Sequence, residues 1–270
     1  RITATRTDKV PNTSATAASS GTDLNGMAAY NAASDIRARL AALAAERGGV
    51  APEQVRFAAG KVVAGHLELE FGALCRQAHM ARISLAASGY YATPKIHYDR
   101  ASHRGRPFYY FAYGAALSEV VIDTLTGEHK VLAVDVLHDV GRSLNPAIDL
   151  GQIEGGFVQG MGWLTTEELV YDAHGRLLTH APSTYKIPTA SDRPARMDIR
   201  LWQAGRNEEA TIHRSKAVGE PPLMLAISVF SALTQAVAAA VSGAGVPALD
   251  APATPERILA AIAAGNADAR

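Results

Sequence analysis

The chain has 270 residues, of which 48% are hydrophobic and 19% are charged, as expected for a globular protein with a sizeable core. Lysine plus arginine and aspartate plus glutamate both number 26, so the formal net charge is zero. This balance predicts no general attraction to nucleic acid or to an anionic membrane.

The cysteine content narrows the kinds of cofactor that the chain could hold. Cys75 is the single cysteine, so an internal disulfide is excluded and a small, buried apolar side chain is expected. An iron–sulfur cluster normally needs about four cysteine ligands, so this chain cannot hold one by itself. The sequence begins with Arg1 and polar residues and carries no signal-peptide pattern, from which we expect a cytoplasmic protein and one piece of a longer subunit.

The first half of the chain predicts helices and strands in an irregular order. A small-residue loop over 11–21 leads into a long helix over 22–47 with a capping-box pattern, Ser20-x-x-Asp23, and Gly48-Gly49 ends that helix. The remaining predictions are two short strands within 54–70, a helix over 72–85, an irregular segment over 89–108, and a hairpin formed by 116–122 and 129–141.

The second half predicts three helices. Asn145-Pro146 starts a glycine-rich helix over 146–162, and the apolar segment 223–241 favours a buried core helix over a membrane span because it contains serine, threonine and glutamine. Strands are expected over 164–171 and 197–203, and an Ala/Pro linker over 243–254 precedes a final helix over 255–264. The fold class is therefore α/β or α+β, with mixed sheets packed against long helices and no regular βαβ alternation.

Glu220 stands out because two prolines follow it in KAVGEPP, directly before the apolar helix. A residue before proline favours extended backbone, so we expect Glu220 to lie outside the helix at its N-terminal end. A fixed carboxylate there could act as a general base. Local sequence alone favours a simpler interpretation, in which Glu220 only complements the helix dipole.

Two further segments could approach a ligand closely. Residues 17–23, AASSGTD, run small side chains into a helix N-terminus, where backbone N–H groups and hydroxyls could hold a phosphate, although ordinary capping explains them equally well. Gln152 lies among glycines and can donate and accept hydrogen bonds, with a glycine-lined helix contact as the alternative. The chain contains no dinucleotide-binding glycine motif, phosphate loop or metal-ligand spacing of His and Cys.

Taken together, these segments resemble the large molybdopterin-binding subunit of the xanthine oxidase family. The matching segments are TAASSGTDLNGMAAY (16–30), YGAALSEVVIDTLTGEHKVL (113–132), DVGRSLNPAIDLGQIEGGFVQGMG (139–162), PSTYKIP (182–188) and SKAVGEPPLMLAISVFSAL (215–233). They cover about residues 10–240, and 243–270 would form a C-terminal linker and short helix. PSTYKIP and KAVGEPPL are most similar to xanthine dehydrogenase. The resemblance implies that 1–270 is the C-terminal portion of the molybdenum-cofactor-binding region.

The resemblance also implies roles for individual residues. Glu220 would be the catalytic base, and Gln152 would contact a molybdenum–molybdopterin cofactor, with or without an added nucleotide. Cofactor contacts are also implied for Ala18, Ser19, Ser20, Gly21 and Thr22, with Ala18 nearest the metal. No conventional protein ligand to molybdenum is implied, because the pterin dithiolene carries the metal in this family.

The implied activity is oxidation of hypoxanthine and xanthine to urate, with water as the oxygen source. Electrons would pass to 2Fe–2S clusters, FAD and then NAD on a partner subunit or domain, in a dimer of heterodimers. The remaining N-terminal part of the molybdenum subunit would complete the purine site, so this chain would be inactive alone. The alternatives are an aldehyde or other N-heterocycle hydroxylase, or a non-catalytic scaffold or assembly module.

Overall fold

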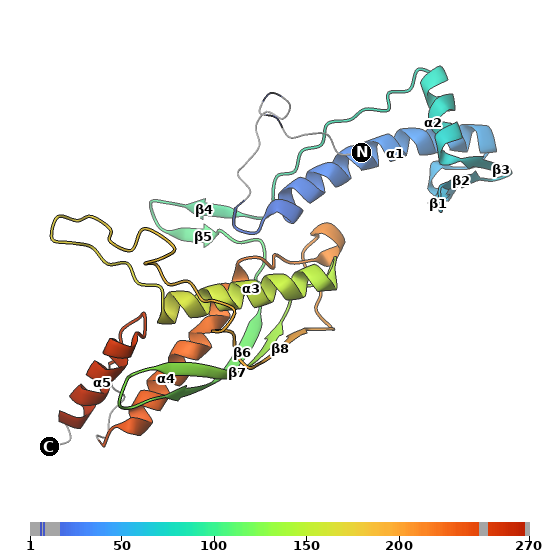
Figure 1. Ribbon diagram of the computed structural model, residues 1–270. Coiled ribbons are helices and arrows are strands. Elements are labelled where there is room, and N and C mark those ends of the chain that lie inside the picture. Colours follow the sequence, from blue (N-terminus) through green and yellow to red (C-terminus); the bar gives the residue numbers. More distant parts are fainter. Residues whose placement is uncertain (1–5, 7, 9–16, 243–247, 268–270) are drawn as a thin grey trace. The chain divides into compact units, whose positions relative to one another are not determined.

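The computed structural model describes residues 6, 8, 17–242 and 248–267 (Figure 1). The chain divides into two compact units, Arg1–Tyr109 and Tyr110–Arg270. Mixed helices and sheets make up both units, which confirms the predicted fold class. Part of the predicted loop over 11–21 and part of the predicted linker over 243–254 lie outside the described residues.

The first unit is built on one long helix. Its elements are the π-helical turn η1 (Thr22–Gly26), α1 (Met27–Gly48), the 3-10 turn η2 (Pro52–Gln54), the strands β1 (Arg56–Ala58), β2 (Lys61–Ala64) and β3 (Leu67–Glu70), α2 (Phe71–Met80), and the strands β4 (His97–Asp99) and β5 (Arg104–Arg106). The predicted helix over 22–47 is confirmed, and it ends at Gly49, whose φ of 67° is the left-handed conformation that glycine adopts freely.

The core of the first unit lies around the C-terminal half of α1. Leu40 and Ala44 of this helix pack with Val62 of the β1–β2–β3 sheet and Leu74 of α2. An extended segment returns along α1 toward its N-terminal half. Arg39 donates to the carbonyls of Ser84 and Ala86, 2.9 and 3.0 Å away, and Asn31 donates to the Tyr90 carbonyl at 2.8 Å. Backbone carbonyls, which any sequence could supply, therefore hold this segment.

Two predictions for the first unit are wrong. The segment 54–70 forms three antiparallel strands rather than two, because tight turns at Gly60 and Gly65, with φ of 79° and 57°, reverse the chain twice. The segment 89–108 is not wholly irregular, since β4 and β5 pair as a short hairpin. The side chains of β4 and β5 are all exposed, so no apolar alternation marked them in the sequence.

The second unit packs three helices on one face of a three-stranded sheet (Figure 1). Its elements are β6 (Gly114–Ile122), β7 (His129–His138), α3 (Pro146–Thr165), β8 (Arg196–Leu201), the 3-10 turns η3 (Ile212–Arg214) and η4 (Pro221–Ala226), α4 (Ile227–Ala240) and α5 (Pro255–Ala267). β6 and β7 form the predicted antiparallel hairpin, and β8 pairs with β7 in parallel after the crossover through α3.

The core of this unit comes from alternating strand residues and one stripe of each helix. Val134 and Val136 of β7 are buried against Phe157 of α3, Leu233 of α4 and Ile258 of α5. Successive strand residues point to opposite faces, so the other face of the sheet carries Leu117 and Leu137, which remain exposed. The helices thus cover only one face of the sheet within this unit.

The apolar segment after Glu220 is only partly the buried helix that we predicted. It begins as the 3-10 turn η4 and continues as α4, whose Val229, Leu233 and Val237 are buried. The stretch Pro221–Ala240 is long and apolar enough to cross a membrane by length and composition, and 22% of it is buried. Its buried stripe packs on the core of this unit, which supports a role as a core helix.

The helix over 146–162 is confirmed and runs further than predicted. Asn145 caps α3 by accepting a hydrogen bond from the Ile148 N–H, and Pro146 takes the first helical position. The predicted strand over 164–171 is wrong, because α3 continues to Thr165, whose hydroxyl donates to the Met161 carbonyl at 2.7 Å. The predicted strand over 197–203 is confirmed as β8.

Candidate functional site

Glu220 is the residue on which η4 begins. Its carbonyl accepts a hydrogen bond from the Leu223 N–H at 3.0 Å, and its side chain is exposed in this chain. The backbone has φ −100° and ψ −38°, so our expectation of extended geometry before proline is wrong. The carbonyl must turn toward Leu223 to close the first 3-10 turn, and this bond outweighs the local preference. Glu220 nevertheless lies at the N-terminal end of the helical segment, as predicted.

Close packing between α3 and η4 fixes the position of the two prolines. A Cβ atom placed on Gly156 would lie 3.1 Å from Cβ of Pro222, and one on Gly160 would collide with the Leu223 carbonyl. Glycine at these positions lets the two backbones approach within a distance that any side chain would block. The glycine-lined contact that we considered as an alternative for this segment is therefore present at Gly156 and Gly160.

Gln152 lies on the same side of α3, one turn before Gly156. Its side chain is exposed, and a Cβ added at the neighbouring Gly151 or Gly155 would meet no atom within 4 Å. The contacts of Gly156 with Pro222 and with the Gly219 carbonyl place the loop that carries Glu220 beside this turn. The structure thus places Gln152 one helical turn from the point where α3 meets the carbonyl of Gly219, the residue before Glu220.

The predicted small-residue segment, Ala18 to Thr22, lies in the first unit and has an unusual backbone. Ala18 and Ser19 have φ of 54° and 51°, a left-handed conformation that side-chain-bearing residues rarely adopt. Ser20 does not cap the helix as the capping-box pattern predicted. Its hydroxyl instead donates to the Ala17 carbonyl at 2.8 Å, and the helix begins at Gly21 without a side-chain cap. A strained turn followed by a π-helical turn is typical of ligand-binding segments.

Taken separately, each unit carries groups that fit a pterin cofactor with phosphate groups. The helix that begins at Gly21 offers backbone N–H groups of the kind that bind phosphate oxygens, and the open surface beside Gln152 offers an amide for a polar ring edge. Among the described residues, no group of three or more His, Cys, Asp or Glu side chains could hold a metal ion.

A buried ion pair, which our sequence reasoning missed, lies just before the Glu220 loop. Lys216 Nζ lies 2.6 Å from Asp139 Oδ2, with side-chain exposures of 6% and 16%. The other Asp139 oxygen accepts from the Gly141 N–H at 2.7 Å, and Lys216 Nζ sits 4.9 Å from the ring centroid of Tyr113. Both charged residues belong to motifs identified in the sequence, but 77 positions separate them, so no local pattern predicts their contact.

His138 lies beside this pair at the end of β7 and is 1% exposed. Among the described residues neither ring nitrogen has a hydrogen-bond partner within normal geometry. Burial lowers the pKa of His138, nearby backbone groups of Tyr113 and Asp139 and the Asp139 carboxylate oppose this effect, and the charge on Lys216 adds to it. The imidazole is therefore neutral in the folded protein at neutral pH.

The lowered pKa of His138 predicts a loss of local stability in mild acid. Below about pH 6.5 the unfolded chain binds a proton that the folded chain does not, so stability falls as pH drops from 6.5 toward the folded pKa. We expect amide exchange across 131–138 in the intact enzyme to accelerate between pH 7.5 and pH 5.5, after correction for intrinsic rates. The pKa of Asp135, lowered by Arg196, affects stability only below its ordinary value near 3.8.

Replacing His138 with glutamine provides the control for this experiment, because glutamine has no charge to gain. The variant is expected to show a smaller acceleration between these two pH values while remaining less protected at both. The acceleration that remains is expected from His129 of the same strand, whose pKa burial also lowers. Equal protection of the unmodified protein at both pH values would contradict the assignment.

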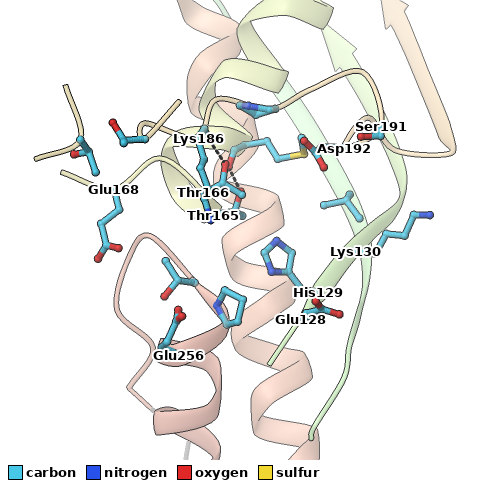
Figure 2. A pocket seen from close by; sticks show the side chains of 17 residues that line it. Glu128, His129, Lys130, Thr165, Thr166, Glu168, Lys186, Ser191, Asp192 and Glu256 are labelled. Carbon is cyan, nitrogen blue, oxygen red and sulfur yellow. Dashed lines mark hydrogen bonds between the residues drawn. The ribbon is translucent and has the colours of Figure 1, made fainter. Parts of the chain in front are cut away.

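A cavity of about 620 Å³ lies elsewhere in the second unit (Figure 2). Its wall carries charges of both signs, including Lys130 and Lys186 and the carboxylates of Glu128, Asp192 and Glu256. None of the predicted site residues lines it. Lys186 belongs to the PSTYKIP segment, and its backbone carbonyl accepts a hydrogen bond from the Thr166 hydroxyl at 2.8 Å. This cavity is therefore separate from the site formed by Gln152 and Glu220.

Comparison with known proteins identifies the family. A family model described as a molybdopterin cofactor-binding domain matches residues 1–194, more than half of the chain. The chain belongs to the molybdopterin cofactor-binding domain family. This confirms the resemblance on which the sequence prediction rested.

The curated relatives of this molybdopterin-binding chain include xanthine dehydrogenases. It is 45% identical over 260 residues to the xanthine dehydrogenase/oxidase of Gallus gallus, covering 95% of this chain and 18% of the relative. It is 48% identical over 242 residues to the xanthine dehydrogenase of Dictyostelium discoideum, covering 88% and 16%. The chain therefore spans less than a fifth of the length of these relatives.

Solved structures share the same fold. Quinoline 2-oxidoreductase from Pseudomonas putida 86 superposes with a TM-score of 0.73 at 27% identity, covering 92% of this chain and 30% of that structure. Reconstituted CO dehydrogenase from Oligotropha carboxidovorans gives a TM-score of 0.78 at 22% identity, covering 97% and 31%. At such low identity the likeness to the latter concerns the fold alone. One fold thus serves enzymes whose names give different substrates, so the fold does not select a substrate for this molybdopterin-binding chain.

Proposed function

We propose that this chain forms part of the molybdenum site of a xanthine dehydrogenase and that Glu220 is the catalytic base. The observation that carries the proposal is the exposed carboxylate of Glu220 at the start of η4, which packs closely on α3 one turn after Gln152, in a chain 45% identical to a xanthine dehydrogenase/oxidase. Hypoxanthine and xanthine are the proposed substrates, and urate is the product.

The residues of this chain would divide the work between binding and proton transfer. Gln152 would hold the pterin by its amide, and the turn at Ala18–Ser19, with Ser20, Gly21 and Thr22, would hold it by backbone N–H groups and hydroxyls. When bound, the molybdenum–pterin group supplies the two-electron chemistry of hydroxylation. Glu220 would accept the proton released from the water-derived oxygen as that oxygen attacks the purine carbon, which makes the oxygen a better nucleophile.

Two electrons must leave the site in each turnover, and the single Cys75 cannot hold an iron–sulfur cluster. We therefore propose that 2Fe–2S clusters, FAD and an NAD site lie on a partner subunit or domain. The coverage of less than a fifth of the relatives leaves ample room for such parts. The residues that select the purine would lie in the remainder of the molybdenum subunit.

Analysis of the intact enzyme tests this proposal. We expect molybdenum, iron and flavin to copurify with activity, and kcat/KM for xanthine to exceed that for aldehydes and for quinoline-type heterocycles. Active material that lacks molybdenum would refute the proposal. A preference for aldehydes would instead move the enzyme to another member of the same family and leave the role of Glu220 intact.

A further inference from the structure

We infer that the buried Lys216–Asp139 ion pair is the positioning device of the catalytic loop, fixing the backbone from which Glu220 projects. The inference rests on the proposed function, because it assigns the pair a role through Glu220. Neither charged group is taken to touch the substrate. The pair would act by holding the chain four residues before Glu220 at one place on the end of β7.

The segment before Lys216 is held in place by buried hydrogen bonds. The carbonyl of Ser215 accepts hydrogen bonds from the Thr211 hydroxyl at 2.7 Å and from the Asn207 amide at 3.1 Å. All three residues are buried. His213 and Arg214 have φ of 47° and 66°, a conformation that persists only where surrounding contacts impose it. These contacts therefore hold the strained turn at His213 and Arg214 and fix the position of Lys216 that follows it.

Lys216 itself contacts the end of β7 through both its backbone and its side chain. Its backbone N–H donates to the Val140 carbonyl at 2.8 Å, and the next residue, Ala217, donates its N–H to the Tyr110 hydroxyl at 2.8 Å. The ammonium group reaches back to Asp139, so backbone and side chain tie this point to the same end of β7. Only Val218 and Gly219 lie between this anchor and Glu220.

The chain that follows Glu220 is fixed by close packing against α3. Pro222 and the Leu223 carbonyl pack against Gly156 and Gly160 of α3, which fixes the chain after the carboxylate. Glu220 is thus held from both sides, by close packing after it and by the ion pair before it. A loop that is fixed at both ends, and whose Val218 also packs against the core of this unit, restricts where a carboxylate can point.

A contribution to stability is a poor explanation for the presence of this ion pair. Two buried charges lose much hydration, and replacing such a pair by uncharged groups of similar size is often neutral or stabilising. A buried pair does fix geometry. Any displacement would separate the two charges, and little water is present to solvate either charge in place of its partner. Since a displacement of about 1 Å can cost 10²-fold in rate, a geometric role has a measurable consequence.

The test uses the intact enzyme with both charges removed together, as Lys216→Met/Asp139→Asn, so that neither is left unpaired. The asparagine keeps an oxygen for the Gly141 N–H. We expect kcat to fall by about 10–100-fold with KM little changed and molybdenum retained. Amide exchange of residues 217–220 should accelerate, and this readout does not depend on activity. If the double variant fails to assemble, Lys216→Gln/Asp139→Asn, which also removes both charges but keeps polar side chains, carries the same comparison.

The matched control is Arg257→Met/Glu168→Gln, which removes a second ion pair of the same unit, at 2.7 Å, that has no contact with the Glu220 loop. It should leave kcat and exchange of 217–220 unchanged. Unchanged kcat and exchange in the Lys216/Asp139 variant would overturn the inference alone. A fully active Glu220→Gln enzyme would instead overturn the proposed function, so the two failures are distinguishable.

Discussion

Replacing Glu220 with glutamine in the intact enzyme is expected to lower kcat by about 10²–10⁴-fold, the range that general bases contribute. Glutamine has nearly the same size as glutamate, and its amide can still accept hydrogen bonds, but it cannot take up a proton. The change therefore removes proton transfer and leaves the packing of η4 on α3 intact. The measurement is steady-state turnover of xanthine, normalised to molybdenum content.

The comparison variant is Glu154→Gln. Glu154 is also exposed and lies on α3 two residues from Gln152, which places it on a different side of the helix. It should retain turnover and molybdenum content. If Glu220→Gln turns over like the unmodified enzyme, a scaffold role for this chain replaces the catalytic one. If it loses molybdenum as well as turnover, Glu220 acts in cofactor retention, and the assignment as base fails.

The sequence predicts elements whose signals are local. Asn145-Pro146 marks the start of α3 correctly, because capping and the fixed φ of proline depend only on neighbouring residues. Gly49 marks the end of α1 for the same reason. The β6–β7 hairpin follows from alternating side chains and a turn at Gly127, whose φ is 76°. These elements require no knowledge of distant contacts.

The wrong predictions concern features that distant contacts decide. The run after Leu164 looks like a strand, yet Glu168 pairs with Arg257 of α5, 89 positions away, and the Leu164 carbonyl accepts from the Ala253 N–H. Such partners leave no trace in local periodicity. The ion pair of Lys216 with Asp139 belongs to the same class, and so does the backbone of Glu220, where one hydrogen bond overrode the preference of a residue before proline.

The motifs of the candidate site could be predicted from the sequence, but their arrangement in the fold could not. The motif around Glu220 and the glycine-flanked Gln152 were identified separately, and the glycines on α3 bring the chain that follows Glu220 against the helix that carries Gln152. No rule of spacing could have connected them. Gly156 and Gly160 allow close packing only because the chain returns to them more than 60 residues later, at Pro222 and Leu223.

The contact of Gly160 with Leu223 leads to the second large expected effect. Replacing Gly160 with leucine places a side chain where the Leu223 carbonyl and, at 2.8 Å from the added Cβ, the Ala226 methyl already lie. A backbone atom cannot rotate away as a side-chain end can, so η4 must separate from α3. Overpacking of a core typically costs about 1–3 kcal/mol, and we expect about 3 kcal/mol here because backbone must move.

Gly155 on the same helix supplies the control, because a Cβ there meets nothing within 4 Å. Gly155→Ala should raise stability by up to about 1 kcal/mol through helix propensity, whereas Gly160→Leu should lower the apparent Tm of the intact enzyme. Movement of η4 also carries Glu220 away from Gln152, so turnover per molybdenum should fall in the Gly160 variant even at temperatures where it remains folded. Equal stability of the two variants would show that α3 and η4 are not packed as closely as the glycines imply. Packing on α3 would then no longer fix the chain after Glu220, which its role as base requires.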